Sequence, residues 1–413
     1  MGEKSTKGHE ASRVVWTNIE GFAREQVQLF LQMVLEEEVT ELLGRAKSAR
    51  RETVEAAPGY RNGHGEPRRL ALTCGTVTVR RPRVRGLEER FVSRILPFFK
   101  RRTEEVAGLL PELYLHGLAL GDFELALRGL LGASAPLSPS SIERLRSKWT
   151  AEYEAWRERS LEGLEVVYAW ADGIYVKAGL EDAKAALLVV VGALRDGRKV
   201  ILALESGHRE SKESWARVLR DLRRRGLSIP RLLVADGHLG IWAALAEVVP
   251  EVEEQRCWNH KVVNVLDQLP QGLQPEAKEL LRAIAYAESR EECERLRDRF
   301  AQRYGQAHPK AVATLRKDWE RMVTFYSFPK EHWKHLRTTN PVESPFASVR
   351  LRTTAAKRYK KVANATALIW KLLMVAESAF RRLDHPELLP QVAEGVKYEN
   401  GVRLITSKRE AAA

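Results

Sequence analysis

The chain has 413 residues, which is enough for two or three domains. Its 68 basic and 55 acidic residues give a formal charge of 68 − 55 = +13, which favours a polyanionic partner. Three cysteines (Cys74, Cys257 and Cys293) without paired spacing argue against a disulfide scaffold and fit a reducing cytoplasm. No run approaches the roughly 18 apolar residues that a membrane span needs, so we expect no membrane partner.

The N-terminal segment combines a helix with a small basic β unit. The apolar stripe of Ile19–Leu43 predicts an amphipathic helix, and Leu70–Cys74 and Thr76–Arg80 predict two short strands about Gly75. Charge runs are usually solvated faces, but the overall charge favours contacts with nucleic-acid phosphates here. Seven arginines crowd this segment: Arg61, Arg68, Arg69, Arg80, Arg81, Arg83 and Arg85. The candidate DNA contacts among them are Arg61, Arg80, Arg81 and Arg83.

The next segment, Arg102–Arg159, is predicted to be helical in pieces. Ser138 as N-cap with Pro139 in the first turn marks the start of its last helix. Two short helices followed by a longer one are typical of a helix-turn-helix, and a plain helical bundle fits equally well. The predicted helices are Glu104–His116, Asp122–Leu131 and the one that opens at Ser138, which carries the candidate DNA contacts Arg144, Arg146 and Lys148.

Two apolar strands further on each reach an Asp-Gly pair. Glu165–Lys177 contains Asp172, and Arg231–Gly240 repeats the pattern with Asp236, 236 − 172 = 64 positions later. A carboxylate in a buried strand is costly unless a cation, a hydrogen-bond network or a metal ion compensates it. For a single Asp-Gly pair, a hairpin turn is the simpler interpretation. Because the pattern occurs twice, we expect the two carboxylates to converge.

The elements around these aspartates predict an α/β domain. Two more strand-like runs, Ala185–Ala193 and Lys199–Glu205, lie between the aspartates, and a helical pattern covers Ser211–Arg225. A further helix is expected at Ile241–Val249. Together these elements indicate a mixed sheet with one crossover connection.

Three features follow the second aspartate. Cys257 and His260 have the C-x-x-H spacing of half a zinc site, but the chain offers no matching second pair, which argues against structural zinc. Residues 271–337 are highly charged and predict a helical insertion. Glu343 is the third acidic candidate, and it also suits an ordinary capping box with Asn340 as N-cap. Basic side chains then predict a strip that contacts phosphates, with Arg350, Arg352 and Lys357 as candidates.

Several of these segments together resemble bacterial insertion-sequence transposases of the Mutator type. They are GYRNG at Gly59–Gly63, WADGIYVK, the pattern ESGxxESxxSW at Glu205–Trp215, LLVADGHLG, RCWNHKVVNVLDQLP and FYSFPKEHWKHLRTTNPVESPFASVRLRT. The resemblance covers residues from about 20 to 385 in unbroken order. It implies a ribonuclease-H-like catalytic domain with a DDE triad that falls on Asp172, Asp236 and Glu343. Cys257 and His260 match the family's C-x-x-H signature, which is not regarded as a catalytic ligand set.

The resemblance also implies a mechanism and partners. Three carboxylates in one site repel one another unless divalent cations lie between them, and oxygen ligands select Mg²⁺, with Mn²⁺ able to substitute. We expect two-metal in-line phosphoryl transfer that cuts the element ends and joins the 3′-OH to target DNA. The expected partners are double-stranded DNA (terminal inverted repeats and target) and at least a second copy of the chain. We therefore expect the protein to lie in the bacterial cytoplasm, associated with the nucleoid.

The predicted organisation is a multidomain α/β protein, a ribonuclease-H-like mixed sheet with a helical insertion preceded by helical and small β DNA-binding modules. Two rival functions remain: a ribonuclease-H-like nuclease or resolvase that never joins ends, and a non-catalytic DNA-binding regulator. The predicted segments are a helical region at 1–55, a basic β unit at 56–101, a helix-turn-helix-like region at 102–160, the catalytic domain at 161–270 and 338–362, the insertion at 271–337, and a C-terminal helix and tail at 363–413.

Overall fold

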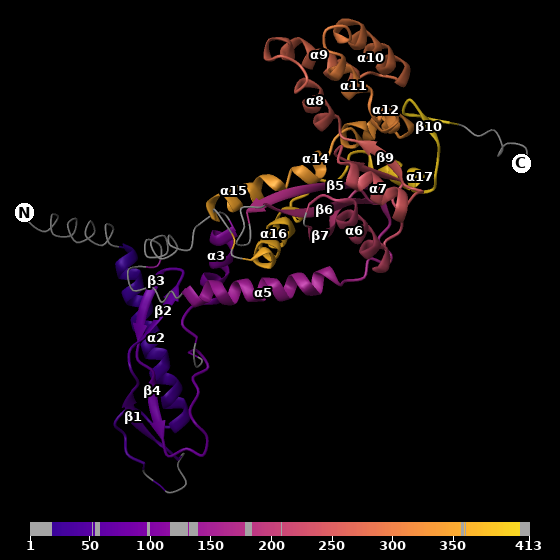
Figure 1. The fold of residues 1–413 in the computed structure, drawn as a ribbon. Coiled ribbons are helices and arrows are strands. Elements are labelled where there is room, and N and C mark those ends of the chain that lie inside the picture. The colour runs from indigo at the N-terminus through magenta and orange to yellow at the C-terminus, as the bar shows by residue number, and fades with distance from the viewer. Residues whose placement is uncertain are drawn as a thin grey trace, which may run out of the picture. The chain divides into compact units, whose positions relative to one another are not determined.

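The structure is a computed structural model that forms two compact units, Met1–Leu145 and Arg146–Ala413 (Figure 1). The predicted multidomain α/β architecture is confirmed, because one unit holds a five-stranded mixed sheet with helices around it. The predicted helix at Asp122–Leu131, except for Leu131, and the Ser138 cap lie outside the described residues. The structure describes residues 19–51, 53, 58–96, 100–115, 131, 139–177, 184–207, 209–356, 359 and 361–404.

The first unit packs one long helix against two small antiparallel sheets of two strands each. Helix α2 (Ile19–Leu43) lies where the apolar stripe predicts it, and its Leu35 packs with Leu70, Val77 and Val79 in a small core. Gly75 begins β3 with a φ of 119°, a left-handed conformation that favours glycine. The strands form antiparallel pairs, β1 (Tyr60–His64) with β4 (Pro82–Arg85) and β2 (Arg68–Leu72) with β3 (Gly75–Val79), and are followed by helices α3 (Glu104–Leu115) and α5 (Pro139–Arg157).

The second unit is built on one sheet whose strand order is β7-β6-β5-β8-β9. The first three strands in the chain are antiparallel neighbours, whereas β8 runs parallel to β5 and β9 parallel to β8. The short β9 was not predicted, because its sequence Glu-Glu-Gln-Arg has no apolar alternation. The strands are β5 (Val166–Lys177), β6 (Lys184–Leu194), β7 (Lys199–Gly207), β8 (Leu232–Ala235) and β9 (Glu253–Arg256).

Strand β5 does not end at its Asp-Gly pair. It continues to Lys177, and Asp172 lies opposite Val189 in the middle of the ladder with β6. The interpretation of Asp172 as a hairpin turn residue is therefore wrong. Residues 174–177 still alternate between buried and exposed, as a strand requires.

Helices cover both faces of this sheet. On one face, α6 (Lys212–Arg224) and α7 (Leu239–Val248) bury Trp215 and Trp242 against the sheet. On the other face, Tyr168 Oη lies 2.9 Å from His332 Nδ1, and Trp170 Nε1 donates to the His335 carbonyl at 2.9 Å. Because side chains alternate along a strand, Asp172 shares the face of Tyr168 and Trp170, whereas Gly173 faces α6.

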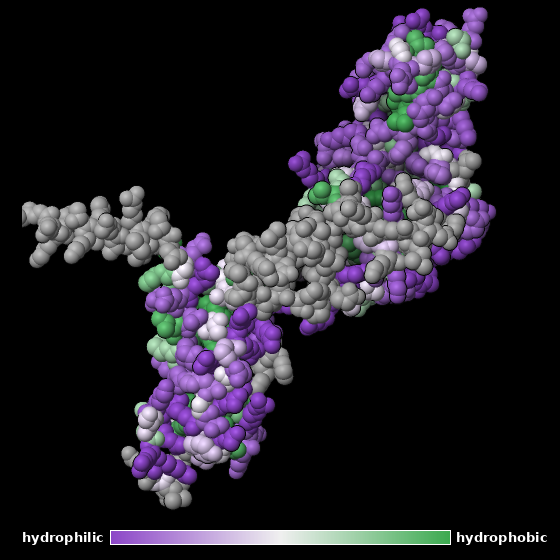
Figure 2. Space-filling view, turned by 60° about the vertical axis from the view of Figure 1, so that its left-hand side comes forward, coloured by the Kyte–Doolittle hydropathy of each residue, from purple (hydrophilic) through white to green (hydrophobic). Residues whose placement is uncertain are grey.

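A chain of short helices follows β9 and returns to the sheet. Phe325, Tyr326, Phe328 and Trp333 near its end are buried. The elements are α8 (Trp258–Leu266), η1 (Gln271–Leu273), α9 (Gln274–Ala285), α10 (Arg290–Tyr304), α11 (Pro309–Arg316), α12 (Trp319–Val323), η2 (Thr324–Ser327), η3 (Lys330–His332) and α13 (Trp333–Leu336). Figure 2 shows that hydrophilic residues prevail on the face it presents, as expected for such charged helices.

The C-terminal part continues with helices and a small hairpin. Among the helices that the structure describes, none is long and apolar enough to cross a membrane. The elements are α14 (Asn340–Glu343), α15 (Phe346–Ala356), α16 (Val362–Glu377), η4 (Pro386–Leu388), α17 (Leu389–Ala393), β10 (Tyr398–Glu399) and β11 (Val402–Arg403).

Gln255 on β9 fastens the helical segment to the edge of the sheet. Its side chain is fully buried, and its Nε2 donates to the Met322 carbonyl at 3.1 Å. Its Oε1 accepts a hydrogen bond from the Phe325 backbone N–H at 2.9 Å. If the amide were lost, the Phe325 N–H would be left unpaired in a dry environment, whereas the Met322 carbonyl would keep its hydrogen bond from Trp258 Nε1 at 2.9 Å.

We therefore expect Gln255→Leu to lower the free energy of unfolding by about 1–3 kcal/mol, which is the cost of one unsatisfied buried group. Urea unfolding of the full chain measures it. The matched control is Gln268→Leu, the same change at an exposed position, which should stay within about 0.5 kcal/mol of the unchanged chain. Equal unfolding midpoints for the two variants would contradict the assigned role of Gln255.

Candidate functional site

Three neighbouring parallel strands bring the predicted site residues to one edge of the sheet. Ala171 of β5 lies opposite Ala235 of β8, and Ala235 lies opposite Arg256 of β9. The next residue of each chain segment is therefore Asp172, Asp236 and Cys257 in turn. The Cys257 N–H donates to the Ala235 carbonyl at 2.7 Å, which extends the ladder to the site.

Asp172 is the most buried of the three acidic candidates. It is 8% exposed, and its Oδ1 accepts a hydrogen bond from the Gly173 N–H at 2.8 Å. The pKa of the Asp172 carboxyl is raised to about 7, mainly by burial and also by the charges of Asp236 and Glu343, while the Gly173 hydrogen bond and His260 oppose this rise. The charges of Asp236 and Glu343 thus both act on the Asp172 carboxylate.

Glu343 reaches this site from α14, and its helix is not capped as predicted. The N-cap residue is Thr339 and not Asn340, and Glu343 is the last residue of a four-residue helix. The Thr339 N–H, which a capping-box glutamate would bind, instead contacts Cys257 Sγ at 3.4 Å. The capping-box interpretation is therefore wrong, and the Glu343 carboxylate accepts a hydrogen bond from the Thr339 hydroxyl.

Cys257 and His260 hold Glu343 in place. The Thr339 hydroxyl lies 3.2 Å from Cys257 Sγ and also bonds the Glu343 carboxylate, so it links the cysteine to the glutamate. His260 Nδ1 lies 4.0 Å from Glu343 Oε1. A hydrogen bond with Cys257 raises the pKa of His260 to about 9, with smaller contributions from Asp172 and Glu343. The C-x-x-H pair therefore contacts the triad, and the ligand atoms of Cys257, His260 and Glu343 lie within 4.8 Å of one another.

A fourth carboxylate, which the sequence analysis did not single out, lies beside Asp236. Ligand atoms of Glu210, Asp236 and His238 also lie within 4.8 Å of one another. Burial raises the pKa of Glu210, and the Asp236 charge raises it further. The signal was present, because Glu210 is the central acid of the ESGxxESxxSW pattern.

The glycine of each Asp-Gly pair makes room for a charged side chain. A Cβ on Gly173 would lie 2.3 Å from Glu210 Oε1, and one on Gly237 would lie 1.9 Å from Arg256 Nη2. Arg256 is itself fixed, since its Nη1 lies 2.8 Å from Asp318 Oδ2. Close approach, and not a hairpin turn, is therefore what these two glycines permit.

This donor set fits divalent cations. Asp172, Asp236, Glu343 and Glu210 offer carboxylate oxygens at one edge of the sheet, and Asp236 raises the pKa of both Asp172 and Glu210 by its charge. Crowded carboxylates are what Mg²⁺ and Mn²⁺ bind, because the cation removes their mutual repulsion. The residues present could hold such an ion.

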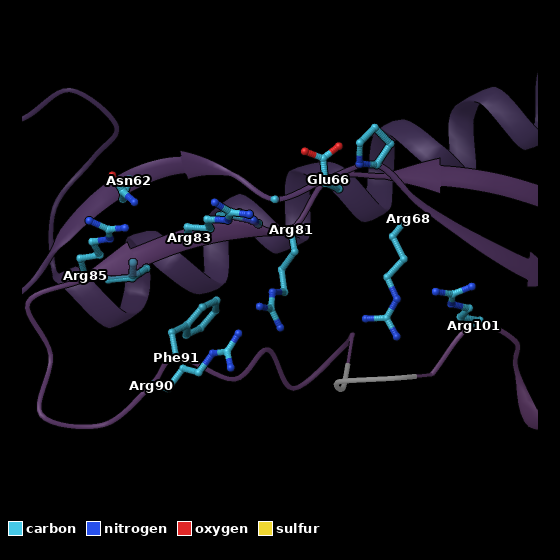
Figure 3. Close-up of a pocket in the computed structure, with 13 residues that line it drawn as sticks. Asn62, Glu66, Arg68, Arg81, Arg83, Arg85, Arg90, Phe91 and Arg101 are labelled. Carbon is cyan, nitrogen blue, oxygen red and sulfur yellow. The ribbon is translucent and has the colours of Figure 1, made fainter.

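Six arginines line one groove of the first unit (Figure 3). Figure 3 shows Arg68, Arg81 and Arg90 directed toward the same space, while Glu66 points away from it. Besides burial, the charges of Arg101 and Arg81 lower the pKa of Arg68, and those of Arg90 and Arg83 lower the pKa of Arg81. An anion in this groove would relieve that repulsion. The groove has a volume of about 550 Å³ and is lined by Arg68, Arg81, Arg83, Arg85, Arg90 and Arg101, with Asn62 and Phe91 among the other residues.

The other predicted DNA contacts are scattered. Arg61 is half-buried and donates to Thr40 Oγ1 at 2.7 Å and Glu36 Oε2 at 3.3 Å, so it is bound to α2. Arg80 is exposed and does not line the groove. Arg350 is exposed on α15, which also contains Arg352, and Lys357 lies outside the described residues. On α5, Arg144 and Lys148 are exposed and Arg146 is half-buried, and Lys148 Nζ lies 3.6 Å from Glu152 Oε1.

Comparison with known proteins places these features in a family. Residues 3–382 match the sequence model described as Transposase, Mutator family. The chain is 44% identical over 296 residues (72% of this chain and 92% of the relative) to the transposase for insertion sequence element IS6120 of Mycolicibacterium smegmatis. It is 41% identical over 279 residues (67% and 94%) to the transposase for IST2 of Acidithiobacillus ferrooxidans. A catalytic core of the HTLV-2 integrase, solved with magnesium, matches 31% of this chain and 88% of its own with 15% identity and a TM-score of 0.18, which is too low to carry an argument.

The raised pKa of Asp172 gives a pH test without metal. Because its folded pKa of about 7 exceeds the unfolded value of 3.8, the folded chain holds the extra proton. Asp172 therefore adds stability at pH values below about 4, and this is lost as the pH rises to about 7. At pH 8 in EDTA, Asp172→Asn should be more stable than the unchanged chain by an amount of the order of 4 kcal/mol.

Unfolding in urea from pH 4 to pH 8 in EDTA measures this difference. The control Asp267→Asn changes an exposed aspartate and should leave the pH profile unaltered. A stability difference between Asp172→Asn and the unchanged chain that does not grow with pH would contradict the raised pKa.

Proposed function

Because this chain belongs to the Mutator family of transposases, we propose that it cuts the ends of an insertion sequence and joins the 3′-OH to target DNA, with Asp172, Asp236 and Glu343 as the catalytic carboxylates. The observation that carries the proposal is that these three residues lie at one edge of the sheet, near enough for Asp236 and Glu343 to act on Asp172 by their charge. They come from the middle of β5, the end of β8 and the end of α14. Their electrostatic effect on Asp172 supports a common site.

The proposed fold of the catalytic unit is ribonuclease-H-like. Three antiparallel strands, followed by two that run parallel to the first and are linked by helices, support this assignment. In such sheets, ligands bind where parallel strands end, which is the edge that carries the aspartates. The helices between β9 and Glu343 correspond to the insertion that the family resemblance implies.

Each triad residue has a task that its position suggests. Asp172 and Asp236 would hold divalent cations from adjacent strands. Glu343 would complete the site from the end of α14, which follows the helical segment. Bound Mg²⁺ or Mn²⁺ would supply the positive charge that stabilises an in-line displacement at phosphorus. Cys257 and Thr339 orient Glu343 through their hydrogen bonds, and His260 balances the charge of the carboxylates.

The proposed reaction has two displacements that conserve bonds. In the first, a water oxygen attacks a phosphorus at the element end, and the bond from that phosphorus to the 3′ oxygen breaks, which leaves a 3′-OH on the element. In the second, this 3′-OH attacks a target phosphorus, and the target's own 3′ oxygen leaves. The site can serve both steps, since both need the same carboxylates around a phosphate.

The arginine groove is proposed to contact double-stranded DNA. Several guanidinium groups line this one groove, and a nucleic-acid backbone offers them several phosphates in succession. Binding of two element ends also requires at least two copies of the chain in one complex. A nuclease or resolvase would cut without joining, and a regulator would bind DNA without either step, so a cleavage assay and a joining assay together separate all three.

Asp172→Asn tests the catalytic assignment. The change keeps the shape of the side chain but removes a charge that a metal ligand needs. We expect joining of a pre-cut element end to target DNA in Mg²⁺ to fall by more than about 100-fold, because even partners outside the ligand set cost about 10–100-fold. Binding to element ends should be unchanged, and Asp196→Asn, on an exposed turn, should join normally. Substantial joining by Asp172→Asn would refute the mechanism.

The double variant Arg81→Gln, Arg101→Gln tests the groove in the full chain. Without these two guanidinium groups, binding to DNA of any sequence should weaken, and the slope of log affinity against log salt should fall by about 2. Fluorescence anisotropy at several salt concentrations measures both quantities. The control Arg295→Gln, Arg303→Gln alters two exposed arginines of α10 and equals the test variant in charge. If the two variants have the same salt slope, the groove is not a DNA contact.

A further inference from the structure

Glu210 carries a buried carboxylate that the protein does not satisfy. The residue is 6% exposed, and its Oε2 has no hydrogen-bond partner in the described part of the chain. The carboxylate does bond the Tyr175 hydroxyl, but one neutral donor does not compensate a buried charge. A side chain kept in this state points to a positive ligand that the protein itself does not provide.

Neighbouring residues fix the position of Glu210. It immediately precedes Ser211, the N-cap of α6, whose side chain accepts from the Ser214 N–H. Its Oε1 fills the position that a Cβ on Gly173 would take, and its carbonyl lies 2.4 Å from the position of a Cβ on Gly240. Two glycines thus allow the Glu210 segment to lie against both β5 and the start of α7.

Glu210 approaches the site from the face of the sheet opposite to Asp172. Asp172 and its neighbour Gly173 point to opposite faces of β5, and Glu210 packs on Gly173. Asp236, at the end of the adjacent strand, acts on both Asp172 and Glu210 by its charge. Asp236 therefore stands between two groups of ligands.

His238 completes the second group. It is the N-cap residue of α7, but its side chain makes no capping hydrogen bond, and it is exposed. Its backbone N–H donates to Asp236 Oδ1 at 2.9 Å, which fixes the two residues relative to each other. The ligand atoms of Glu210, Asp236 and His238 lie within 4.8 Å of one another, a span that one cation can bridge.

We propose that Glu210, Asp236 and His238 bind a divalent cation, with Asp236 shared between this ion and the group formed by Asp172 and Glu343. The inference rests on the proposed function and adds a fourth carboxylate and an imidazole to its metal site. Two oxygen ligands and one nitrogen ligand favour Mn²⁺ over Mg²⁺, because Mg²⁺ prefers oxygen and imidazole suits transition metals. The site should therefore be filled by Mn²⁺ at lower concentration than by Mg²⁺.

Mn²⁺ binding to the full chain, followed by the electron paramagnetic resonance of free Mn²⁺, tests this directly. Glu210→Gln should weaken one class of Mn²⁺ sites by at least about tenfold and leave the other class in place. The matched control is Glu213→Gln, the same change on an exposed glutamate in the first turn of α6, and it should bind Mn²⁺ like the unchanged chain. In EDTA, Glu210→Gln should melt no lower than the unchanged chain, because it removes an unsatisfied buried charge.

His238→Ala gives an independent variant, because the residue is exposed and its loss leaves the core intact. It should weaken the same class of sites and reduce the preference for Mn²⁺ over Mg²⁺. Wild-type Mn²⁺ affinity in Glu210→Gln or in His238→Ala would overturn the inference. The proposed function is tested separately by Asp172→Asn, and it fails if that variant keeps joining activity. If Asp172→Asn loses joining while Glu210→Gln binds Mn²⁺ normally, the proposed function stands and only the second metal site is overturned.

Discussion

The second unit depends on the burial of negative charge at the edge where three parallel strands end. β5, β8 and β9 are held in register by their backbone hydrogen bonds, so the residues that follow Ala171, Ala235 and Arg256 must lie side by side. Two of these three residues are aspartates, and burial is the main reason that the pKa of Asp172 rises to about 7. A sheet that only needed stability would place apolar or neutral groups here. The arrangement becomes favourable when a cation is bound.

A long segment of short helices lies between β9 and α14 in the chain, and Glu343 of α14 lies at this same edge of the sheet. Tyr168 and Trp170, four and two residues before Asp172 on the same face of β5, bind the segment that contains His332 and His335. The Gln255 side chain of β9 forms hydrogen bonds with the backbone of Met322 and Phe325 in the same helical segment. Cys257 then contacts Thr339, which orients Glu343. Each link begins at a strand that also carries or borders a site residue, so the position of Glu343 follows from the sheet.

Much of this could be predicted from the sequence, and the failures have physical reasons. Long apolar periodicity located α2 and the strands around Asp172, since burial there is extensive. The same approach missed β9, because a polar four-residue strand is held by backbone bonds and not by side-chain pattern. It placed the cap of α14 at Asn340, because local propensity favours asparagine, whereas the tertiary contact with Cys257 selects Thr339. Glu210 was overlooked because its importance comes from glycines that are distant in the chain, Gly173 and Gly240.

Each unit holds like charges close together, positive in the groove of the first unit and negative at the sheet edge of the second. This property would suit the first to a nucleic acid and the second to a metal ion. In the groove, neighbouring arginines lower the pKa of Arg68 and Arg81, and at the sheet edge, neighbouring carboxylates raise the pKa of Asp172 and Glu210. Repulsion between like charges lowers the free energy of unfolding of the ligand-free protein, and a bound ligand of opposite charge raises it again. Phosphates would serve the first site and divalent cations the second.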